Sequence, residues 1–467
     1  MHSSAKNARH RLIRLCSKEP QLGRGEIFYY DNHRRITQAQ AIQAYNSEVA
    51  LLFFQKALSA LPDPRRRQGI RYPLKTIIVV ALMAMVCGAD DAEAMESWGN
   101  KREDWLRTIL ELPHGAPTQD VYLRVFGALD PEAFQDVVSS WAQVIYVQLS
   151  NSVKNISIDG KTSRRSHDAA KGIAAIHTVS AWCREAGIVI GQTKTEEKSN
   201  EIVAIPKLLK KLDIKNATIT IDAMGCQTEI ADLIIRKGGD YLLAVKENQP
   251  KLYHDVETAF NYVDTCKNRV EQGLDIPLIP LAVESYTETD KGHGRLEKRS
   301  IEISRDLDWI MDHIQKWTNI AYIVRVTRER THLAKNKTSV EIAYYIGSHP
   351  ETKIESIADS IRGHWSIENS LHWVLDMAFR EDEARHRAEN AAANMSTLRH
   401  FALNLIKQDK TRKLGVANTR KEAGWDNDYL IHILISARNS LHANTEVNVR
   451  PLQRTNTKIL ADADGLI

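Results

Sequence analysis

Two aspartates lie where a folded chain has little reason to place a negative charge. Asp159 follows the apolar stretch Asn155–Ile158. Asp222 follows Ala217–Ile221 in the same way, so each carboxylate closes a predicted strand. Strand ends are where ligands and catalytic groups gather in mixed α/β sheets. Neighbouring strands would hold both carboxylates side by side, and a divalent cation would relieve their repulsion. The alternative is that each aspartate only begins a turn or caps a helix.

Glu368 is a third acidic residue in an unexpected position. On a helical wheel of Ile361–Arg380, at about 100° per residue, it falls on the broad apolar arc of the predicted helix. A carboxylate that faces a core is costly unless it is paired or metal-bound. His364 and His372 flank it by one turn, so a buried ion pair or a His–Glu hydrogen bond is the alternative. Zinc is disfavoured because two helical turns separate the histidines.

Three carboxylates of this kind suit two-metal phosphoryl transfer. Hard oxygen ligands favour Mg²⁺ or Mn²⁺. Two such ions, about 3.5–4 Å apart, stabilise the attacking and leaving oxygens of an in-line displacement at phosphate. We therefore predict that Asp159, Asp222 and Glu368 are both the metal ligands and the catalytic residues.

Composition describes an ordinary globular chain. It has 467 residues, 43% hydrophobic and 26% charged, with a formal net charge of +4, which argues against disorder and permits a nucleic-acid partner. The five cysteines are dispersed and form no CxxC pair, which suits a reducing cytoplasm. The longest apolar run, Thr76–Cys87, is shorter than the roughly 20 residues of a membrane span. We expect a cytoplasmic, nucleoid-associated protein without a membrane segment.

Hydrophobic periodicity divides the chain into regions. It changes from helical to mixed α/β after Lys154, and a segment with Pro277, Pro280 and alternating strands interrupts the α/β pattern. The predicted regions are a basic, poorly ordered extension (1–40), a small all-helical domain (41–150), an α/β core in two parts (151–249 and 350–410), a β-rich insertion (250–349) and a C-terminal segment and tail (411–467).

Several separated motifs resemble the DDE transposases of bacterial insertion sequences, in the branch of the H-repeat-associated proteins. They occur in the family's order, over roughly residues 45–435, and together they are far more specific than one DxG. The matching stretches are Leu61–Leu74 (LPDPRRRQGIRYPL), Ser157–Ser166 (SIDGKTSRRS), Gly191–Ile202 (GQTKTEEKSNEI), Thr220–Gln227 (TIDAMGCQ), Tyr241–Pro250 (YLLAVKENQP) and Arg362–Asp382 (RGHWSIENSLHWVLDMAFRED).

The resemblance implies an RNase H-like catalytic core, a mixed sheet with helices on both faces. It implies that Asp159, Asp222 and Glu368 form the metal-binding triad and that a β-strand insertion precedes the glutamate helix. The wider superfamily often surrounds the glutamate with Tyr-x2-Arg-x3-Glu-x6-Lys. Ile361, His364 and Leu375 occupy the other three positions here. The family's Arg and Lys contacts therefore do not carry over, and cleavage through a DNA hairpin stays open.

Basic clusters and aromatic residues are candidates for DNA contact, with a solvated surface as the alternative for each cluster. Lys161, Arg164 and Arg165 follow Asp159 and would border the scissile phosphate. Arg362, His364 or Arg380 could replace the missing family contacts. Trp365 is more often a core residue than a stacking one. A further basic cluster occupies Arg325–Lys337. The residues predicted to contact DNA are Arg65, Arg66, Arg67, Lys161, Arg164, Arg165, Arg362, His364, Trp373 and Arg380.

The sequence therefore predicts a cut-and-paste transposase that acts on double-stranded DNA, both terminal inverted repeats and target. Two ends must be cut together, so a homodimer is expected. One alternative is a structure-specific nuclease of the same fold. Another is a DNA-binding relic without catalysis, although the intact Asp159, Asp222 and Glu368 argue against it.

Overall fold

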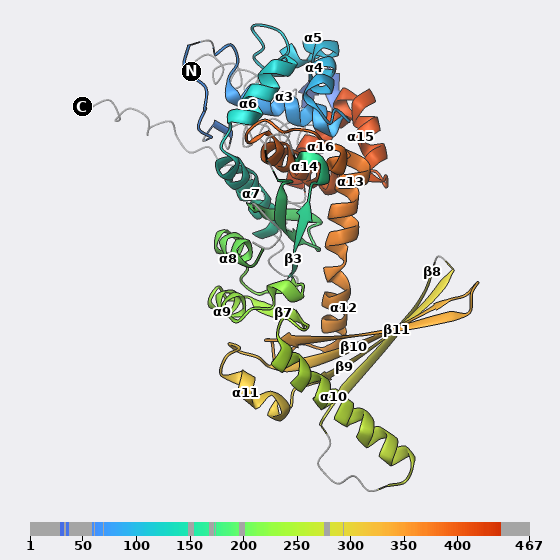
Figure 1. Ribbon diagram of the computed structural model, residues 1–467. Helices are drawn as coiled ribbons and strands as arrows, with labels where there is room; N and C mark the ends of the chain where they lie inside the picture. Colours follow the sequence, from blue (N-terminus) through green and yellow to red (C-terminus); the bar gives the residue numbers. More distant parts are fainter. Residues whose placement is uncertain are drawn as a thin grey trace, which may run out of the picture.

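The computed structural model describes residues 29–31, 34–36, 58–59, 61–68, 70–147, 154–167, 172, 174–195, 201–274, 281–292 and 294–439. The molecule is elongated, with helices at one end, a sheet through its middle and a projecting group of strands at the other end (Figure 1). None of the described helices combines the length and the apolarity needed to cross a bilayer. The predicted tail beyond residue 439 lies outside the described residues.

The helical region is built around one buried helix. Every residue of α3 except Lys75 is buried, which explains the long apolar run in the sequence. The side chains of this helix belong to the same core as those of the sheet, which extends from Leu58 to Ile433. The helices of this region are α3 (Leu74–Val86), α4 (Ala92–Lys101), α5 (Glu103–Ile109), α6 (Gln119–Ala128) and α7 (Pro131–Val147).

A nine-stranded sheet crosses the molecule in the order β5-β4-β3-β6-β7-β11-β10-β9-β8. Its first three strands are antiparallel neighbours, whereas β6 and β7 run parallel to β3. This order and these directions are those of an RNase H-like core, so the predicted fold is confirmed. The core strands are β3 (Lys154–Thr162), β4 (His177–Cys183), β5 (Ile188–Thr195), β6 (Ala217–Ile221) and β7 (Asp240–Val245).

Helices cover both faces of this core. On one face, α8 (Glu201–Lys211) packs against β4 and β5, and α9 (Thr228–Arg236) packs against β7. On the other, α12 (Ile354–His364) crosses β3 and β6. The hydroxyl of Ser360 on α12 donates to the side chain of Asn155 at 2.6 Å, which places the odd-numbered residues of β3 on the α12 face.

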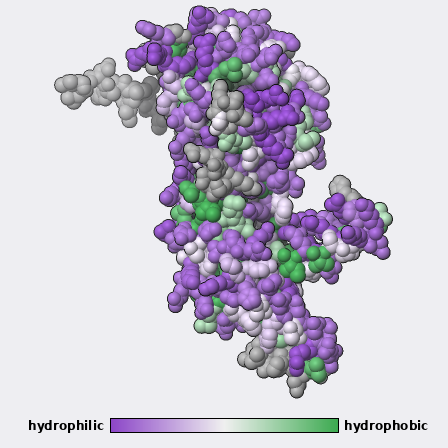
Figure 2. All heavy atoms as spheres, in the orientation of Figure 1, coloured by the Kyte–Doolittle hydropathy of each residue, from purple (hydrophilic) through white to green (hydrophobic). Residues whose placement is uncertain are grey.

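The insertion differs from the β-rich prediction in two ways. It begins with a 22-residue helix, α10 (Pro250–Glu271), which has proline at its start and buried residues at helical spacing. Its strands then extend the core sheet, because β11 pairs with β7. We call β8–β11 the arm, which projects from a mainly hydrophilic surface (Figures 1 and 2). Its strands are β8 (Glu284–Gly292), β9 (Arg295–Ser304), β10 (Tyr322–His332) and β11 (Lys337–Gly347), with α11 (Met311–Ile314) between β9 and β10.

The predicted single helix over Ile361–Arg380 is instead two helices joined by a wider turn. After α12, residues Glu368–His372 form a π-helical turn, and α13 (Trp373–Phe379) follows. The chain then continues through α14 (Ala391–Gln408), α15 (Val416–Trp425) and α16 (Asn427–Asn439), of which only α14 was predicted.

One part of the predicted disordered extension is ordered. Tyr29–Asp31 (β1) and Arg34–Ile36 (β2) pair as a short antiparallel hairpin. The prediction was therefore wrong for these six residues. The rest of 1–40 lies outside the described residues.

Candidate active site

Sheet register brings the two aspartates onto neighbouring strands. The parallel pairing of β3 with β6 ends at Ile158 and Ile221, and each aspartate is the next residue in the sequence. Asp159 does not end its strand as predicted, because β3 continues to Thr162 in antiparallel pairing with β4. Asp159 thus lies where β6 turns away, and its side chain faces the side of the sheet that α12 covers.

Glu368 is exposed, not buried as the helical wheel predicted. The backbone N–H of Trp373 bonds to the Glu368 carbonyl, five residues earlier, so the turn is wider than that of an α-helix. This extra residue changes the phase of the helix. Leu371 is buried, whereas the Glu368 side chain is 57% exposed and lies near β3. π-Helical turns of this kind are frequent at functional sites.

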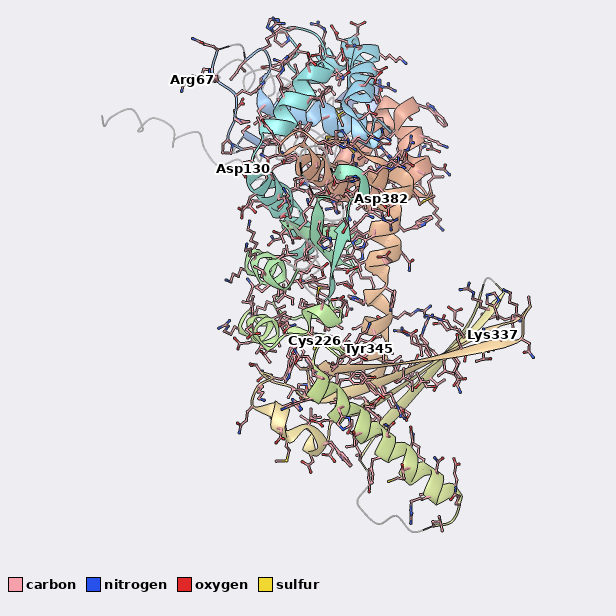
Figure 3. All side chains as sticks on the ribbon, in the orientation of Figure 1. Arg67, Asp130, Cys226, Lys337, Tyr345 and Asp382 are labelled. Atoms are coloured by element: carbon pink, nitrogen blue, oxygen red, sulfur yellow. The ribbon has the colours of Figure 1, made fainter. Side chains whose placement is uncertain are left out.

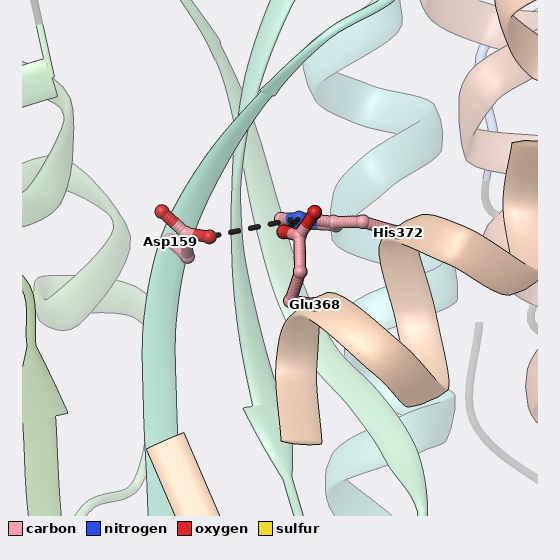
Figure 4. Close-up of side chains that lie close together, drawn as sticks. All are labelled: Asp159, Glu368 and His372. Carbon is pink, nitrogen blue, oxygen red and sulfur yellow. Dashed lines mark hydrogen bonds and ion pairs between the residues drawn. The ribbon is translucent and has the colours of Figure 1, made fainter. Parts of the chain in front are cut away.

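Asp159, Glu368 and His372 form one cluster, in which a ligand atom of each lies within 4.8 Å of the others (Figure 4). The Nδ1 atom of His372 is 3.0 Å from Glu368 Oε2 and 3.6 Å from Asp159 Oδ2. His372 is buried, and its Nε2 atom has no hydrogen-bond partner among the described residues. The His–Glu hydrogen bond considered from the sequence is present, and the histidine nitrogen that forms it also lies close to Asp159.

The electrostatics of the cluster favour a cation. Burial raises the pKa of the Asp159 carboxyl to about 6, partly opposed by His372 and increased by the charges of Asp222 and Glu201. Burial also raises the pKa of Asp222. The hydrogen bond from His372 lowers the pKa of Glu368, which is the more exposed acid. Partly buried carboxyls with raised pKa values are a common feature of functional sites.

The Asp222 carboxylate is turned differently from the other two. It accepts hydrogen bonds from the backbone N–H groups of Met224 (3.1 Å) and Gly225 (3.3 Å), so it caps the short 3₁₀ helix Ala223–Gly225. The capping interpretation therefore holds for this residue, which also follows the strand next to β3. Its carboxylate is outside the close cluster of the described residues.

Lys161 is an internal ion-pair partner in this structure. Its Nζ atom donates to Asp376 Oδ2 at 2.7 Å and lies 3.8 Å from Asp382 Oδ1. Lys161 therefore ties β3 to the helix that follows Glu368. Arg164 and Arg165, predicted with it as phosphate contacts, are exposed, and Arg164 lies 3.4 Å from Asp382.

The remaining predicted DNA contacts are spread over the molecule. Arg65 binds Asp63 at 2.7 Å, whereas Arg66 and Arg67 are exposed on the helical end (Figure 3). Arg362 reaches the arm, where it pairs with Asp290 at 3.3 Å.

Three residues near the glutamate complete the predicted contacts. Arg380 is exposed and donates from Nε to Glu383 at 2.9 Å. His364 bonds to the Thr220 hydroxyl at 3.0 Å, and burial lowers its pKa to about 4, which makes it a poor cation for phosphate. Trp373 is exposed.

Trp365 was favoured as a core residue, and this was wrong. Its side chain is exposed beside Arg328, whose guanidinium carbon is 5.6 Å from the ring centroid. The residue lies just before the π-helical turn, on the exposed side of the helix with Trp373 and Met377.

Two residues of the site were not assigned a role from the sequence. His372 was considered as a hydrogen-bond partner of Glu368 but was not included in the predicted metal site, although its four-residue distance from Glu368 places both on one helical face. Asp376 lies four residues after His372 and so shares the same helical face. Its partner Lys161 is distant in sequence, so no local pattern reveals the pair.

Comparison with known proteins identifies the family. Residues 55–142 match the family model described as DDE_Tnp_1-associated, and residues 153–405 match the Transposase DDE domain. The chain is 37% identical over 382 residues to the protein named "Putative transposase YncI" of Escherichia coli O157:H7, covering 81% of this chain and 93% of the relative. It is 36% identical to the "H repeat-associated putative transposase YhhI" of Escherichia coli strain K12, covering 81% and 96%.

A solved structure of the piggyBac transposase synaptic complex with hairpin DNA aligns over 85% of this chain and 82% of its own, with 11% identity and a TM-score of 0.36. That score is too low to support an argument, and the assignment depends on the sequence matches alone. Because the Transposase DDE domain spans more than half of the sequence, and relatives of similar length match nearly end to end, this chain belongs to the DDE transposase family.

Proposed function

We propose that this protein binds the ends of an insertion sequence and catalyses metal-dependent DNA cleavage and strand transfer. The observation that carries the proposal is the close cluster of Asp159, Glu368 and His372, formed by residues far apart in the sequence. The raised pKa values of Asp159 and Asp222 support it, because His372 and Lys246 do not offset the effect of burial on these carboxyls, and a bound cation would favour their ionised forms.

The donor set fits Mg²⁺ or Mn²⁺. Asp159 and Glu368 offer hard oxygen atoms, and His372 offers a nitrogen atom that both ions accept, Mn²⁺ more readily. We propose that these residues, with Asp222, hold two ions in the DNA-bound enzyme. Bound divalent ions would supply Lewis acidity at the scissile phosphate and a lowered pKa for the attacking water or 3′-hydroxyl.

The side chains around the cluster have definable tasks. Before an ion binds, the hydrogen bond from His372 Nδ1 holds the Glu368 carboxylate, and an ion bound at Nδ1 would replace that bond. Lys161 keeps the helix that follows Glu368 against β3 through Asp376. The exposed Arg164 and Arg165 lie in a short 3₁₀ helix directly after β3 and would contact backbone phosphates.

More distant surfaces would bind the rest of the DNA. Arg67 marks the helical end and Lys337 the arm, and both regions carry exposed cations (Figure 3). Exposed Trp373 would stack on an unpaired base near the cleavage point. We propose that the helical domain (41–150) recognises the element ends and that a homodimer, acting in the nucleoid, cuts both ends together.

An excision assay tests this function. A marker is placed between the DNA segments that flank this coding sequence, and its loss is scored with wild-type protein and with Asp159→Asn. Excision should fall at least about 10³-fold in the variant, since one carboxylate of the phosphoryl-transfer site is gone. Asp255→Asn is a matched control, because this acid also pairs with a histidine, His313 at 2.8 Å, but on α10.

Wild-type excision with unchanged excision by Asp159→Asn would reject the site. Cleavage at the ends without joining would favour a nuclease. No cleavage by a folded wild-type protein would favour a DNA-binding relic.

A further inference from the structure

A second pair of acid and histidine lies buried behind the proposed active site. Glu201 and His177 are both almost fully buried, and the distance between Glu201 Oε1 and His177 Nε2 is 2.6 Å. On its other nitrogen, His177 Nδ1 lies 2.7 Å from the hydroxyl of Thr162. A continuous chain of hydrogen bonds therefore links β3, β4 and the first residue of α8.

The position of Glu201 is unusual for its place in the helix. A glutamate in the first turn interacts favourably with the helix dipole while it remains in water. Glu201 gives up that hydration, which is costly unless a partner compensates for it, and His177 is that partner. Helix stability alone therefore does not explain why this acid is buried. Glu201 also belongs to the motif Gly191–Ile202, to which the proposed chemistry gives no role.

The pair packs directly on the residue that follows Asp159. A Cβ atom at Gly160 would overlap with both Glu201 Oε1 and His177 Nε2, so this contact requires glycine. The two side chains therefore press on β3 from the α8 face, while the Asp159 side chain projects from the opposite face. Thr162 lies two residues further along the same strand, and its hydroxyl is hydrogen-bonded to His177 Nδ1.

The charge of Glu201 also affects the acidic residues of the site. Its negative charge adds to the effect of burial in raising the pKa of both Asp159 and Asp222. The described residues place it outside the close metal-binding cluster, so it acts at a distance and not as a ligand.

We propose that Glu201 is a positioning residue for Asp159: through His177 and Thr162 it fixes the end of β3 at Gly160, and so sets the Asp159 carboxylate for metal binding. This inference depends on the proposed metal site. Partners one step removed from metal ligands commonly change metal affinity by about 10–100-fold when they are lost.

The test measures binding of Mn²⁺ alone to the full chain, by the electron paramagnetic resonance signal of the free ion. Glu201→Ala should raise the Kd for Mn²⁺ at least about tenfold. Glu201→Gln, whose amide keeps a hydrogen bond to His177, should remain within about threefold of wild type. Asp255→Asn, which alters the remote acid–histidine pair with His313, should leave the Kd unchanged.

Circular dichroism and a thermal melt establish that each variant is folded. Should Glu201→Ala not fold, Thr162→Val replaces it. This variant removes the hydrogen bond between Thr162 and His177 and should weaken Mn²⁺ binding several-fold. Wild-type affinity in a folded Glu201→Ala or in Thr162→Val would overturn the inference. Equal losses in the Ala and Gln variants would also overturn it, since Glu201 would then supply charge and not position.

Asp159→Asn separates this inference from the function on which it depends. If that variant binds Mn²⁺ as tightly as wild type, the metal site itself is wrong. If Asp159→Asn loses binding while Glu201→Ala keeps it, only the positioning role fails.

Discussion

Two groups of carboxylates in this molecule have opposite surroundings. Beside the arm, Asp264 and Glu302 both bind Arg325, with Asp264 Oδ2 2.6 Å from Nη1 and Glu302 Oε2 2.7 Å from Nε. At the active site, Asp159 has Asp222 and Glu201 as acidic neighbours and only His372 as a cationic candidate. Asp222 is likewise affected by the charge of Glu201, which Lys246 partly opposes.

The pKa values follow these surroundings. The hydrogen bond to Arg325 lowers the pKa of Asp264, whereas burial raises the pKa of Asp159 to about 6. A carboxylate that faces an arginine stabilises the fold. One that is buried without such a partner costs stability, and the cost is understandable where a metal ion must bind.

The largest effect in this comparison should come from Arg325→Met. This change leaves Glu302, which is nearly buried, with only Lys267 at 2.6 Å as a cationic partner. We expect the free energy of unfolding to fall by about 3 kcal/mol, as measured by urea denaturation. The double variant Arg325→Met/Glu302→Leu should recover most of this loss, because neither charge then remains buried. A loss below about 1 kcal/mol in the single variant would contradict a structural role for this group.

Much of the core was predictable from the sequence because its signals are local. β6 has the predicted bounds, Ala217–Ile221, since an apolar run ends there at a capping aspartate. α9 and β7 differ from their predicted bounds by one residue at each end or less. Asp159 and Glu368 could be named as candidates for the same reason, from residue type and the motifs around them, and the structure brings them into one cluster.

The rest depends on information that no local pattern holds. Pairing of β7 with β11 joins the insertion to the core sheet, and it connects strands separated by the whole of α10 and most of the arm. Glu368 is exposed at the start of the π-helical turn, and a wheel with a constant angle per residue cannot represent that turn. The missed α10 is different, because its proline start and helical spacing were present in the sequence.

Removing a charge at the active site should instead raise the stability of the protein. In the folded, metal-free protein the pKa of Asp159 is about 6, above that of an unfolded aspartate, so the folded state binds more protons between pH 4 and 6. Wild-type stability should therefore fall as pH rises through this window, by an amount on the order of 2 kcal/mol. Asp159→Asn lacks this titration and should be more stable than wild type at pH 7.

Thermal melts in EDTA at pH 4, 5.5 and 7 measure this difference. The advantage of Asp159→Asn should be small at pH 4 and should grow to its full value above pH 6. An advantage that does not change with pH would show that the Asp159 charge is not the source of the cost. Asp264→Asn, in the other group, should instead be less stable than wild type at all three pH values, because Arg325 lowers the pKa of this carboxyl and its contribution to stability is lost only as the pH falls below about 4.

The smallest change in the free energy of unfolding should come from breaking an exposed ion pair on the arm. Glu329 lies 3.9 Å from Lys298, and both side chains are well exposed to solvent. Glu329→Gln should change the free energy of unfolding by less than about 0.5 kcal/mol in the same urea titration, because water screens the pair and the side chains lose entropy when they form it. A change above about 1 kcal/mol would mean that ion pairing as such stabilises the arm. A negligible change beside a large loss in Arg325→Met would instead assign the stabilisation to burial, the same property that makes Asp159 costly where no arginine faces it.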